Sequence, residues 1–508
     1  MKNIYKIGLL SLALFAGACN KDYLDTKPTN ATSAGTVFET TANAKLAVNG
    51  LAKMMTMQYL SNQGFNGEGT IKMYYGNYPG NHFFVNLSGW AAIINATYNE
   101  RVDVVYCYYP WYYYYKLIGN ANTIIAHIDA ANGPEAEKQY IKAQALTYRA
   151  YSFTMLAQIY CYRWQDSNNG ETPGLVLRTD ESTGDMKLST LGETYKQIYA
   201  DLDQAIDLFA KSGKTRANNF EVDETVAQAI YARAALNRQD YATAETYAVK
   251  ARAKYPLMSN AEYKGGFSTV NKEWIWSSYG AADETLYYFS YQAYIGYNST
   301  AGAVRTTPKC ISRELYNKIP ASDIRKGLFL DPKTDAYTTA TGVAGDALKA
   351  RAFAAFPDLQ SNSTVFAYMQ FKVKANDQPG VGNLNHFRSS EMYLIEAEAK
   401  YFQNKPATEV QQVLEALTRG SGRDASYTCT KTGADLLNEI KTYRAIELWG
   451  EGFDWFDMKR WNDPIVRHDY NSGGNFLSAL AVTIQPSEKN KWTWKIPLRE
   501  TDYNGALE

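Results

Sequence analysis

The sequence predicts a mainly α-helical protein, in which tetratricopeptide-like helical hairpins form a scaffold that carries a loop-rich irregular insertion. Apolar residues recur at steps of three and four over several segments, which is the spacing of one face of an α-helix. Short, alanine-rich helical segments follow one another through brief interruptions, as helical hairpins require. Residues 263–388 lack this spacing and separate two helical regions. Such a long excursion inside a helical scaffold is usually functional.

The clearest helical pattern lies between Thr190 and Pro256. Its first helix begins with a capping box, because Glu193 follows Thr190 by three positions. The apolar face of that helix contains Leu191, Tyr195, Ile198, Leu202, Ala205 and Phe209. Two shorter helices are predicted over Glu224–Asn237 and Tyr241–Tyr255. They carry small residues and a proline at tetratricopeptide positions, namely Ala232, Ala244, Ala251 and Pro256. We therefore expect these two helices to fold back on each other as a hairpin.

Other segments extend the helical scaffold on both sides. Helical spacing is also present in Asn43–Tyr59, Trp111–Ala131, Glu135–Tyr160, Ser390–Phe402 and Thr408–Leu417. Gly133 and Pro134 separate two of these helices, and Lys405 and Pro406 another two, as short connections between antiparallel neighbours. The patterns together predict four hairpins. They divide into an N-terminal repeat region over residues 37–262 and a C-terminal region over residues 389–508.

Aromatic residues are the compositional outlier. The chain has 41 Tyr and 10 Trp, and aromatics make up 14% of it. Tyr and Trp combine an apolar body with a polar tip, so they suit partly hydrated surfaces such as interfaces and sugar-binding platforms. The competing interpretation, which holds for most single tyrosines, is a tyrosine-rich core.

Two irregular stretches combine aromatics with glycines, and loops carry function more often than regular elements do. The first is Leu60–Asn99 and the second is the insertion. We predict a ligand-binding surface built from both, with the candidate residues Trp90, Tyr98, Trp274, Tyr294 and Tyr297. Within the insertion, alternation over residues 273–276 predicts a short strand in which Ile275 points away from the two flanking tryptophans.

The charge balance, the cysteines and the missing motifs argue against several classes of function. Lys plus Arg and Asp plus Glu number 52 each, so the totals give no sign of a nucleic-acid-binding face. The five cysteines are scattered, which argues against a zinc site or a disulfide scaffold. We find no catalytic motif and expect no cofactor, because the chain has no serine elbow, no zinc-protease motif and no phosphate loop. The four histidines stand alone in the sequence.

The N-terminus has the features of an export signal. Lys2 and Lys6 precede an apolar run from Ile7 to Ala18 that is too short to span a bilayer. Cys19 follows directly, and this junction resembles the lipobox of bacterial lipoproteins, with Ala16 where the pattern prefers Leu. Residues 1–18 are thus predicted to be a lipoprotein signal peptide, Cys19 the acylated residue and residues 19–36 a tether. The alternative is a secreted protein with an unmodified Cys19.

The C-terminal region carries a motif with a wider resemblance. The motif reads Arg444-Ala-Ile-Glu447-Leu448-Trp449-Gly450-Glu451-Gly452-Phe453-Asp454-Trp455-Phe456-Asp457-Met458-Lys459-Arg460-Trp461. It resembles the signature of the SusD/RagB family. Further pieces are similar along the chain: Asp22 to Asp25 with Pro28, Asn120 to Asn122, Arg149-Ala150, Glu391 to Ala399, Ile496-Pro497, Glu500 and Asn504. One departure is Asp454, where many members carry Arg.

The resemblance implies a SusD-like fold and an outer-membrane, cell-surface lipoprotein. Such a protein binds oligosaccharides and presents them to a partner TonB-dependent, SusC-like barrel transporter, without breaking bonds. Three alternatives remain open: a peptide-binding protein of the same architecture, a protein-assembly scaffold, and a glycoside hydrolase. The last would use Glu447 and Glu451 as paired carboxylates, although two groups on one helical face cannot easily flank a sugar. The charged stripe of Arg444, Glu447 and Glu451 instead suggests a link between its helix and the surroundings.

Overall fold

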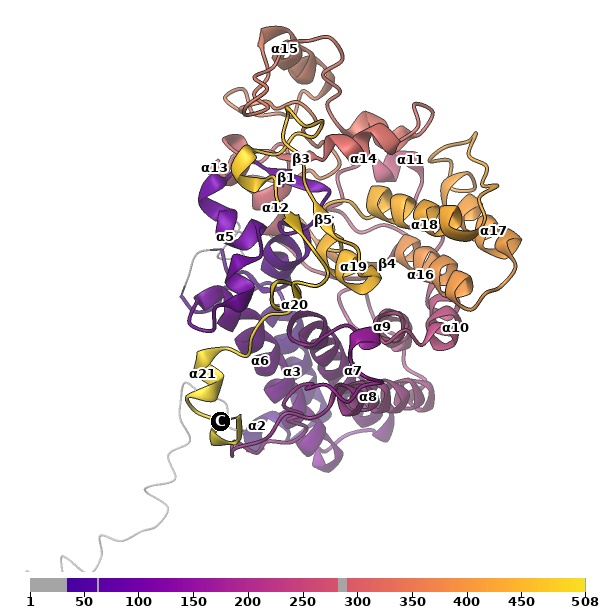
Figure 1. Ribbon diagram of the computed structural model, residues 1–508. Helices are drawn as coiled ribbons and strands as arrows, with labels where there is room; N and C mark the ends of the chain where they lie inside the picture. Colours follow the sequence, from indigo (N-terminus) through magenta and orange to yellow (C-terminus); the bar gives the residue numbers. More distant parts are fainter. Residues whose placement is uncertain (1–33, 62–63, 282–289, 508) are drawn as a thin grey trace, which may run out of the picture.

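The computed structural model describes residues 34–61, 64–281 and 290–507 of the chain (Figure 1). The predicted signal peptide, Cys19 and nearly all of the predicted tether lie outside these residues. The last three residues of the predicted tether, 34–36, belong to the short helix α2 (Ala34–Val37). None of the described helices is long and apolar enough to cross a membrane.

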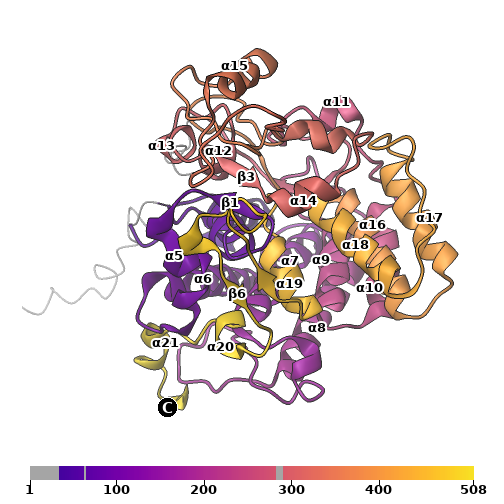
Figure 2. The same cartoon turned by 45° about the horizontal axis from the view of Figure 1, so that its top comes forward.

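A row of long helices forms the scaffold, so the mainly helical prediction is confirmed. The helices are α3 (Thr41–Met54), α6 (Val105–His127), α7 (Glu135–Tyr160), α8 (Leu191–Ser212), α9 (Glu224–Asn237), α10 (Tyr241–Arg252), α16 (Ser389–Phe402), α17 (Ala407–Thr418), α18 (Gly433–Glu447) and α19 (Asp454–Trp461). Neighbours from α6 to α10 pack in chain order, and α10 then packs on α16, which packs on α17. Figure 2 shows α9, α10 and α16 side by side. The scaffold therefore continues across the insertion.

The local signals explain why these helices form. Helix α8 begins with the expected capping box and ends at Gly213, whose φ of 60° is left-handed. All six predicted apolar residues of this helix are buried. The alanines of α9 are fully buried, at positions 227, 229, 232, 234 and 235. Their small side chains let α7 and α10 pack closely on this helix. Helix α6 begins earlier than predicted and contains Pro110 in its second turn. Pro110 cannot donate to the carbonyl oxygen of Tyr106, and the Tyr75 hydroxyl donates to that oxygen at 2.6 Å instead.

The insertion starts and ends on one two-stranded sheet. Strand β2 (Trp274–Ser278) pairs antiparallel with β4 (Leu384–Arg388), and β1 (Phe83–Val85) pairs with β3 (Lys309–Ile311). A third pair joins β5 (Ile465–Val466) to β6 (Thr483–Ile484). The short strand predicted around residues 273–276 is confirmed as β2. All five of its residues are buried, and its pairing with β4 is irregular on both sides of Trp276.

Short helices fill the remaining regions. They are α4 (Gly67–Thr70), the π-helix η2 (Ile71–Asn77), η3 (Ser88–Trp90), α5 (Ala91–Ile94), η4 (Thr97–Glu100), η5 (Ile128–Ala130), η6 (Trp164–Asp166), α11 (Asn260–Tyr263), α12 (Tyr291–Ile295), α13 (Gly302–Arg305), α14 (Arg313–Lys318), η8 (Ile324–Leu328), α15 (Asp346–Ala355), η9 (Ser478–Leu480), α20 (Lys489–Trp492), α21 (Leu498–Thr501) and η10 (Gly505–Leu507). Both ribbon views place α13 and α15 near one end of the molecule and α21 with the C-terminus at the other.

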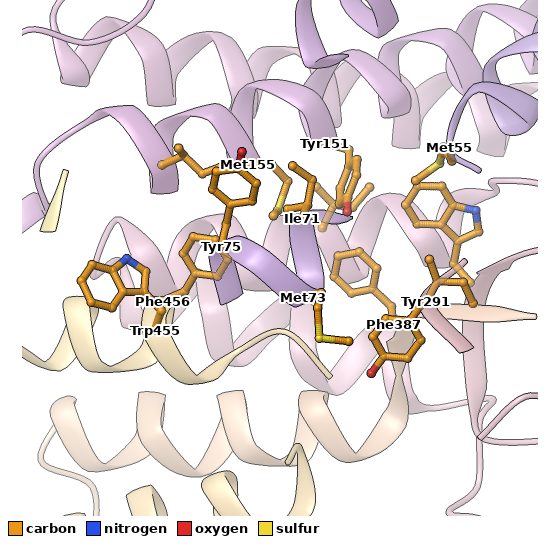
Figure 3. Packing of buried hydrophobic residues seen from close by; sticks show 14 of the residues in the cluster. Met55, Ile71, Met73, Tyr75, Tyr151, Met155, Tyr291, Phe387, Trp455 and Phe456 are labelled. Atoms are coloured by element: carbon orange, nitrogen blue, oxygen red, sulfur yellow. The ribbon is translucent and has the colours of Figure 1, made fainter. Parts of the chain in front are cut away.

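One hydrophobic core joins the scaffold, the insertion and the signature helix α19. Figure 3 shows part of it, with residues of η2 lying between α7 and α19. Tyr75 of η2, Met155 of α7 and Phe456 of α19 are all buried there. A smaller cluster lies between α16, α17 and α18. The insertion is therefore held on the scaffold by apolar packing, and the β2–β4 pair joins its two ends.

Candidate functional site

The family-like motif forms a buried ionic network around Arg388. The Arg388 guanidinium donates to Glu273 and Glu447 at 2.7 Å each, and to both oxygens of Glu451 at 2.7 and 2.8 Å. Lys372 donates to Glu451 Oε1 at 2.7 Å and to the carbonyl oxygens of residues 447 and 449. The Arg388 side chain is 1% exposed. This network ties the end of α18 to β4 and to Glu273, the residue directly before β2.

The same network decides the roles of the two glutamates. Burial by itself would raise the pKa of Glu451, but the charges of Arg388 and Lys372 outweigh it and hold that pKa at about 2. Burial also opposes ionisation of Glu447, and Arg388 and Arg325 overcome it, so the pKa of Glu447 lies below its usual value. A glycosidase acid must hold a proton near neutral pH. Glu447 and Glu451 are therefore structural anions and do not form an acid and nucleophile pair.

The rest of the signature is held in a second ionic group. Arg444 Nε donates to Asp457 at 2.6 Å, and Arg460 bonds both Asp457 and Glu398. Arg444 thus faces α19 and does not share the partners of Glu447 and Glu451. At the departure from the family pattern, Asp454 Oδ2 accepts the backbone N–H of His82 at 2.6 Å. Burial raises the pKa of Asp454 to about 7.

Three of the five predicted ligand residues meet in one half-buried aromatic cluster. The Trp90 ring lies 4.8 Å from Tyr74 and 6.0 Å from Tyr106, and Tyr74 also contacts Tyr294 at 6.1 Å. Tyr98 stacks on Tyr106 at 5.4 Å. We call these five residues the aromatic cluster. The structure therefore brings together residues from both irregular stretches that the sequence singled out.

The other two candidates are buried away from this cluster. Trp274 is 1% exposed within β2. Tyr297 is 7% exposed and packs against Phe371 and Phe356 at 5.1 and 5.8 Å. Neither ring has a face available to a ligand in this structure, because protein side chains already cover it. Their aromatic, glycine-rich context belongs to the core of the insertion.

A pocket of about 270 Å³ opens beside the aromatic cluster. Its polar side chains include Gln58, Asn66 and Gln292, and its aromatic walls are Tyr279 and Tyr291. Helix α12 contributes Tyr291 and Gln292 to the pocket and Tyr294 to the cluster, so the two features share a wall. We call this cavity the Tyr279 pocket. Amide side chains both donate and accept hydrogen bonds, so these walls suit a ligand with many hydroxyl groups.

Close backbone contacts shape the Tyr279 pocket. A Cβ atom at Gly280 would lie 2.1 Å from the carbonyl oxygen of Gly382, and one at Gly380 would lie 2.4 Å from the backbone nitrogen of Ala293. Both glycines line the pocket. Larger residues there would push its walls apart. The glycines therefore fix the geometry of the loops around the cavity.

Tyr279 is the functional candidate that sequence reasoning missed. It directly follows β2, its side chain is 57% exposed, and its ring meets Phe220 edge-on at 5.3 Å. Single exposed aromatic residues are ordinary on protein surfaces, and Tyr279 becomes a candidate because it also lines a pocket. The local signal was weak: an aromatic residue followed by a glycine, three residues beyond the predicted strand. Nothing in the local sequence distinguishes it from the buried Trp274.

The chain thus combines a helical-hairpin scaffold with a surface pocket lined by aromatic and amide side chains. Residues 22–264 match a family model described as starch-binding, associating with outer membrane, and residues 350–507 match the SusD family model. The chain belongs to the SusD/RagB family.

Individual relatives agree with this assignment. The chain is 24% identical over 489 residues to SusD-like protein P2 of Formosa agariphila, covering 90% of each chain. Among solved structures, it resembles a SusD-like carbohydrate binding protein from Bacteroides vulgatus with a TM-score of 0.74 and 23% identity, covering 92% of this chain and 98% of that one. A SusD superfamily protein from Bacteroides thetaiotaomicron gives a TM-score of 0.72 at 20% identity, with 92% and 99% covered. These structural matches show the fold.

Proposed function

We propose that this protein is a lipid-anchored, cell-surface protein that binds oligosaccharides and delivers them to a TonB-dependent, SusC-like barrel transporter. The Tyr279 pocket carries this proposal, because it combines an exposed aromatic ring with amide side chains in a cavity beside the aromatic cluster. The family description of starch binding and outer-membrane association supports the ligand class and the location. The named carbohydrate-binding relative supports the ligand class as well.

Binding at this site follows from the chemistry of sugars. The C–H face of a pyranose ring packs on the Tyr279 ring, while hydroxyl groups exchange hydrogen bonds with the half-buried Gln58 and the exposed Lys53 of the same lining. A cavity of about 270 Å³ holds one or two sugar units, so the rest of a longer chain lies over Tyr279 and the aromatic cluster. The buried ionic roles of Glu447 and Glu451 favour capture of an intact chain over cleavage.

We expect Tyr279→Ala to weaken oligosaccharide binding at least tenfold, equal to about 1.4 kcal/mol. The substitution removes the exposed ring and leaves β2 and its hydrogen bonds in place. The measurement is calorimetric titration with the tightest oligosaccharide from a glycan panel. The matched control is Tyr162→Ala, which removes a 37% exposed tyrosine outside the pocket and should leave affinity unchanged.

Equal affinity of the Tyr279→Ala and wild-type proteins would show that the oligosaccharide does not bind in the Tyr279 pocket. A parallel panel of peptides tests the peptide-binding alternative. Binding of peptides with no response to any glycan would replace the proposed ligand class. Binding of a protein partner alone would favour the assembly scaffold.

We expect Cys19→Ser to release the protein from the membrane fraction. Acyl chains on Cys19 provide the anchor, and the described body has no helix that crosses a membrane. Fractionation of cells that produce each form, with intact-mass measurement of the purified protein, checks this result. A Cys19→Ser protein that stays in the membrane fraction in the wild-type amount contradicts lipid anchoring at this residue.

A further inference from the structure

The outer face of α6 carries tyrosines that the aromatic cluster does not use. In the run from Tyr112 to Tyr115, the middle two residues are fully buried, and the outer two are half-buried. Tyr108, Tyr112, Tyr115 and Gly119 recur at steps of four and three, so they lie on one helical face. The rings of Tyr108 and Tyr112 lie 5.5 Å apart. Half-exposed tyrosines thus line α6 from its first turns to its middle.

This face leads to a second cavity, of about 440 Å³. Tyr115, Gly119 and Asn122 of α6 form one wall, and Arg178 and neighbouring loop residues form the other. Glu500, beside the C-terminal end of the chain, closes one side. We call it the Arg178 pocket. An α-helix rises about 1.5 Å per residue, so Tyr106 of the aromatic cluster and Asn122 lie roughly 24 Å apart along α6. The Arg178 pocket shares no lining residue with the Tyr279 pocket.

Buried polar side chains hold the loop wall of the Arg178 pocket. Asn122 is 2% exposed, and its amide donates to the carbonyl oxygens of Arg178 and Asp180 at 3.0 and 2.8 Å. Arg149 is 5% exposed and donates to the carbonyl oxygen of Thr179 at 2.9 Å, while Asp201 holds its guanidinium at 2.6 Å. Buried side chains therefore fix the carbonyl groups of three successive residues, 178 to 180. A loop that is ordered in this way keeps its side chains in place before a ligand arrives.

The charged groups of the pocket are also fixed. Glu500 accepts from Trp111 Nε1 at 3.0 Å and from Asn504 at 3.1 Å. Glu181 accepts from Thr123 at 2.9 Å and faces His127 at 2.9 Å. Arg178 donates through Nη1 to the carbonyl oxygen of Gly184 at 2.9 Å, and a guanidinium has further N–H donors. The walls thus hold positively charged hydrogen-bond donors and negatively charged acceptors in fixed positions.

We propose that the Arg178 pocket is a second saccharide-binding site, which takes a neutral, polyhydroxylated ring. Hydroxyl groups donate to Asp180 and Glu500 and accept from Arg178, and a ring face packs on Tyr115. An anion would face carboxylates, and an ammonium group would face the guanidinium, so a neutral polyol fits both walls. Tyr112 and Tyr108 then extend the site along α6 for further units of the chain. This site stands on its own residues and does not depend on the Tyr279 pocket.

Gly119→Trp tests the second site. A Cβ atom at Gly119 meets nothing within 4 Å, so the new side chain fills the pocket without displacing backbone, and the helix gains propensity. Gly50→Trp is the matched control, because Gly50 is an exposed helical glycine of α3 with equal space. The probes are maltose, cellobiose, laminaribiose and lactose at millimolar concentration. Saturation-transfer NMR with the full mature protein measures the signal of each bound disaccharide. The same set is repeated in the Tyr279→Ala background.

We expect at least one disaccharide signal to persist in Tyr279→Ala and to fall at least fivefold when Gly119→Trp is added. Gly50→Trp should leave that signal unchanged. Equal signals for Gly119→Trp and Gly50→Trp with every probe would overturn the second site, as would silence of all four probes in the Tyr279→Ala background. If Gly119→Trp lowers binding and Tyr279→Ala does not, the proposal for the Tyr279 pocket is wrong and the proposal for the Arg178 pocket is supported. The two proposals are therefore tested separately.

Discussion

Arg388→Met should lower the free energy of unfolding by about 3–5 kcal/mol, the usual cost of leaving buried charges without their partner. Arg388 is the shared donor of three buried carboxylates, those of Glu273, Glu447 and Glu451. Methionine fills a similar volume but donates no hydrogen bond. Lys372 and Arg325 still contact the network, so part of the negative charge stays compensated.

Urea unfolding followed by circular dichroism at pH 7 measures this loss. Lys211→Met is the matched control, since Lys211 pairs with Asp207 at the surface, where such pairs contribute less than about 1 kcal/mol. Without Arg388, the nearest cation to Glu273 is Arg423 at 3.7 Å. Adding Glu273→Gln to Arg388→Met removes this poorly compensated charge and should restore part of the stability. A loss below 1 kcal/mol in Arg388→Met would show that the network does not hold the insertion on the scaffold.

Gly76→Ala should lower stability by about 3 kcal/mol, at the upper end of the usual cost of overpacking. Gly76 lies in η2, and a Cβ atom there would lie 2.1 Å from the carbonyl oxygen of Gly452 in the signature motif. Because the opposing atom belongs to the backbone, no side-chain rotation relieves the overlap. The two segments must move apart and weaken the core shown in Figure 3.

The melting temperature of Gly76→Ala, compared with Gly50→Ala, checks this result. Gly50 is open to solvent, so alanine there should be neutral or stabilising by up to about 1 kcal/mol. Similar melting temperatures for the two variants would mean that η2 and the motif are not in close contact.

Helices were predictable where local signals agree. Helix α8 has a capping box, a regular apolar face and a terminal glycine, and the structure follows all three. The resemblance in the C-terminal motif also predicted the fold class. The partner of its glutamates was not predictable, because Arg388 comes from β4, far back along the chain, and ionic contacts leave no local periodicity.

The candidate site was predictable only in part. Trp90, Tyr98 and Tyr294 meet in the aromatic cluster, but the same composition also pointed to Trp274 and Tyr297, which are buried. Whether an aromatic residue is exposed depends on the pairing of β2 with β4 and on the packing of the insertion. Those contacts join distant parts of the chain, so composition alone could not separate Tyr279 from its neighbours.

A crystal structure of the mature protein with its tightest oligosaccharide tests the central claim most directly, together with a mass spectrum of the ligand after incubation. We predict an intact oligosaccharide with one ring against Tyr279 and hydroxyl groups bonded to Gln58 or Lys53. A Tyr279 pocket without sugar in the complex, or an oligosaccharide cut into shorter products, would contradict the account.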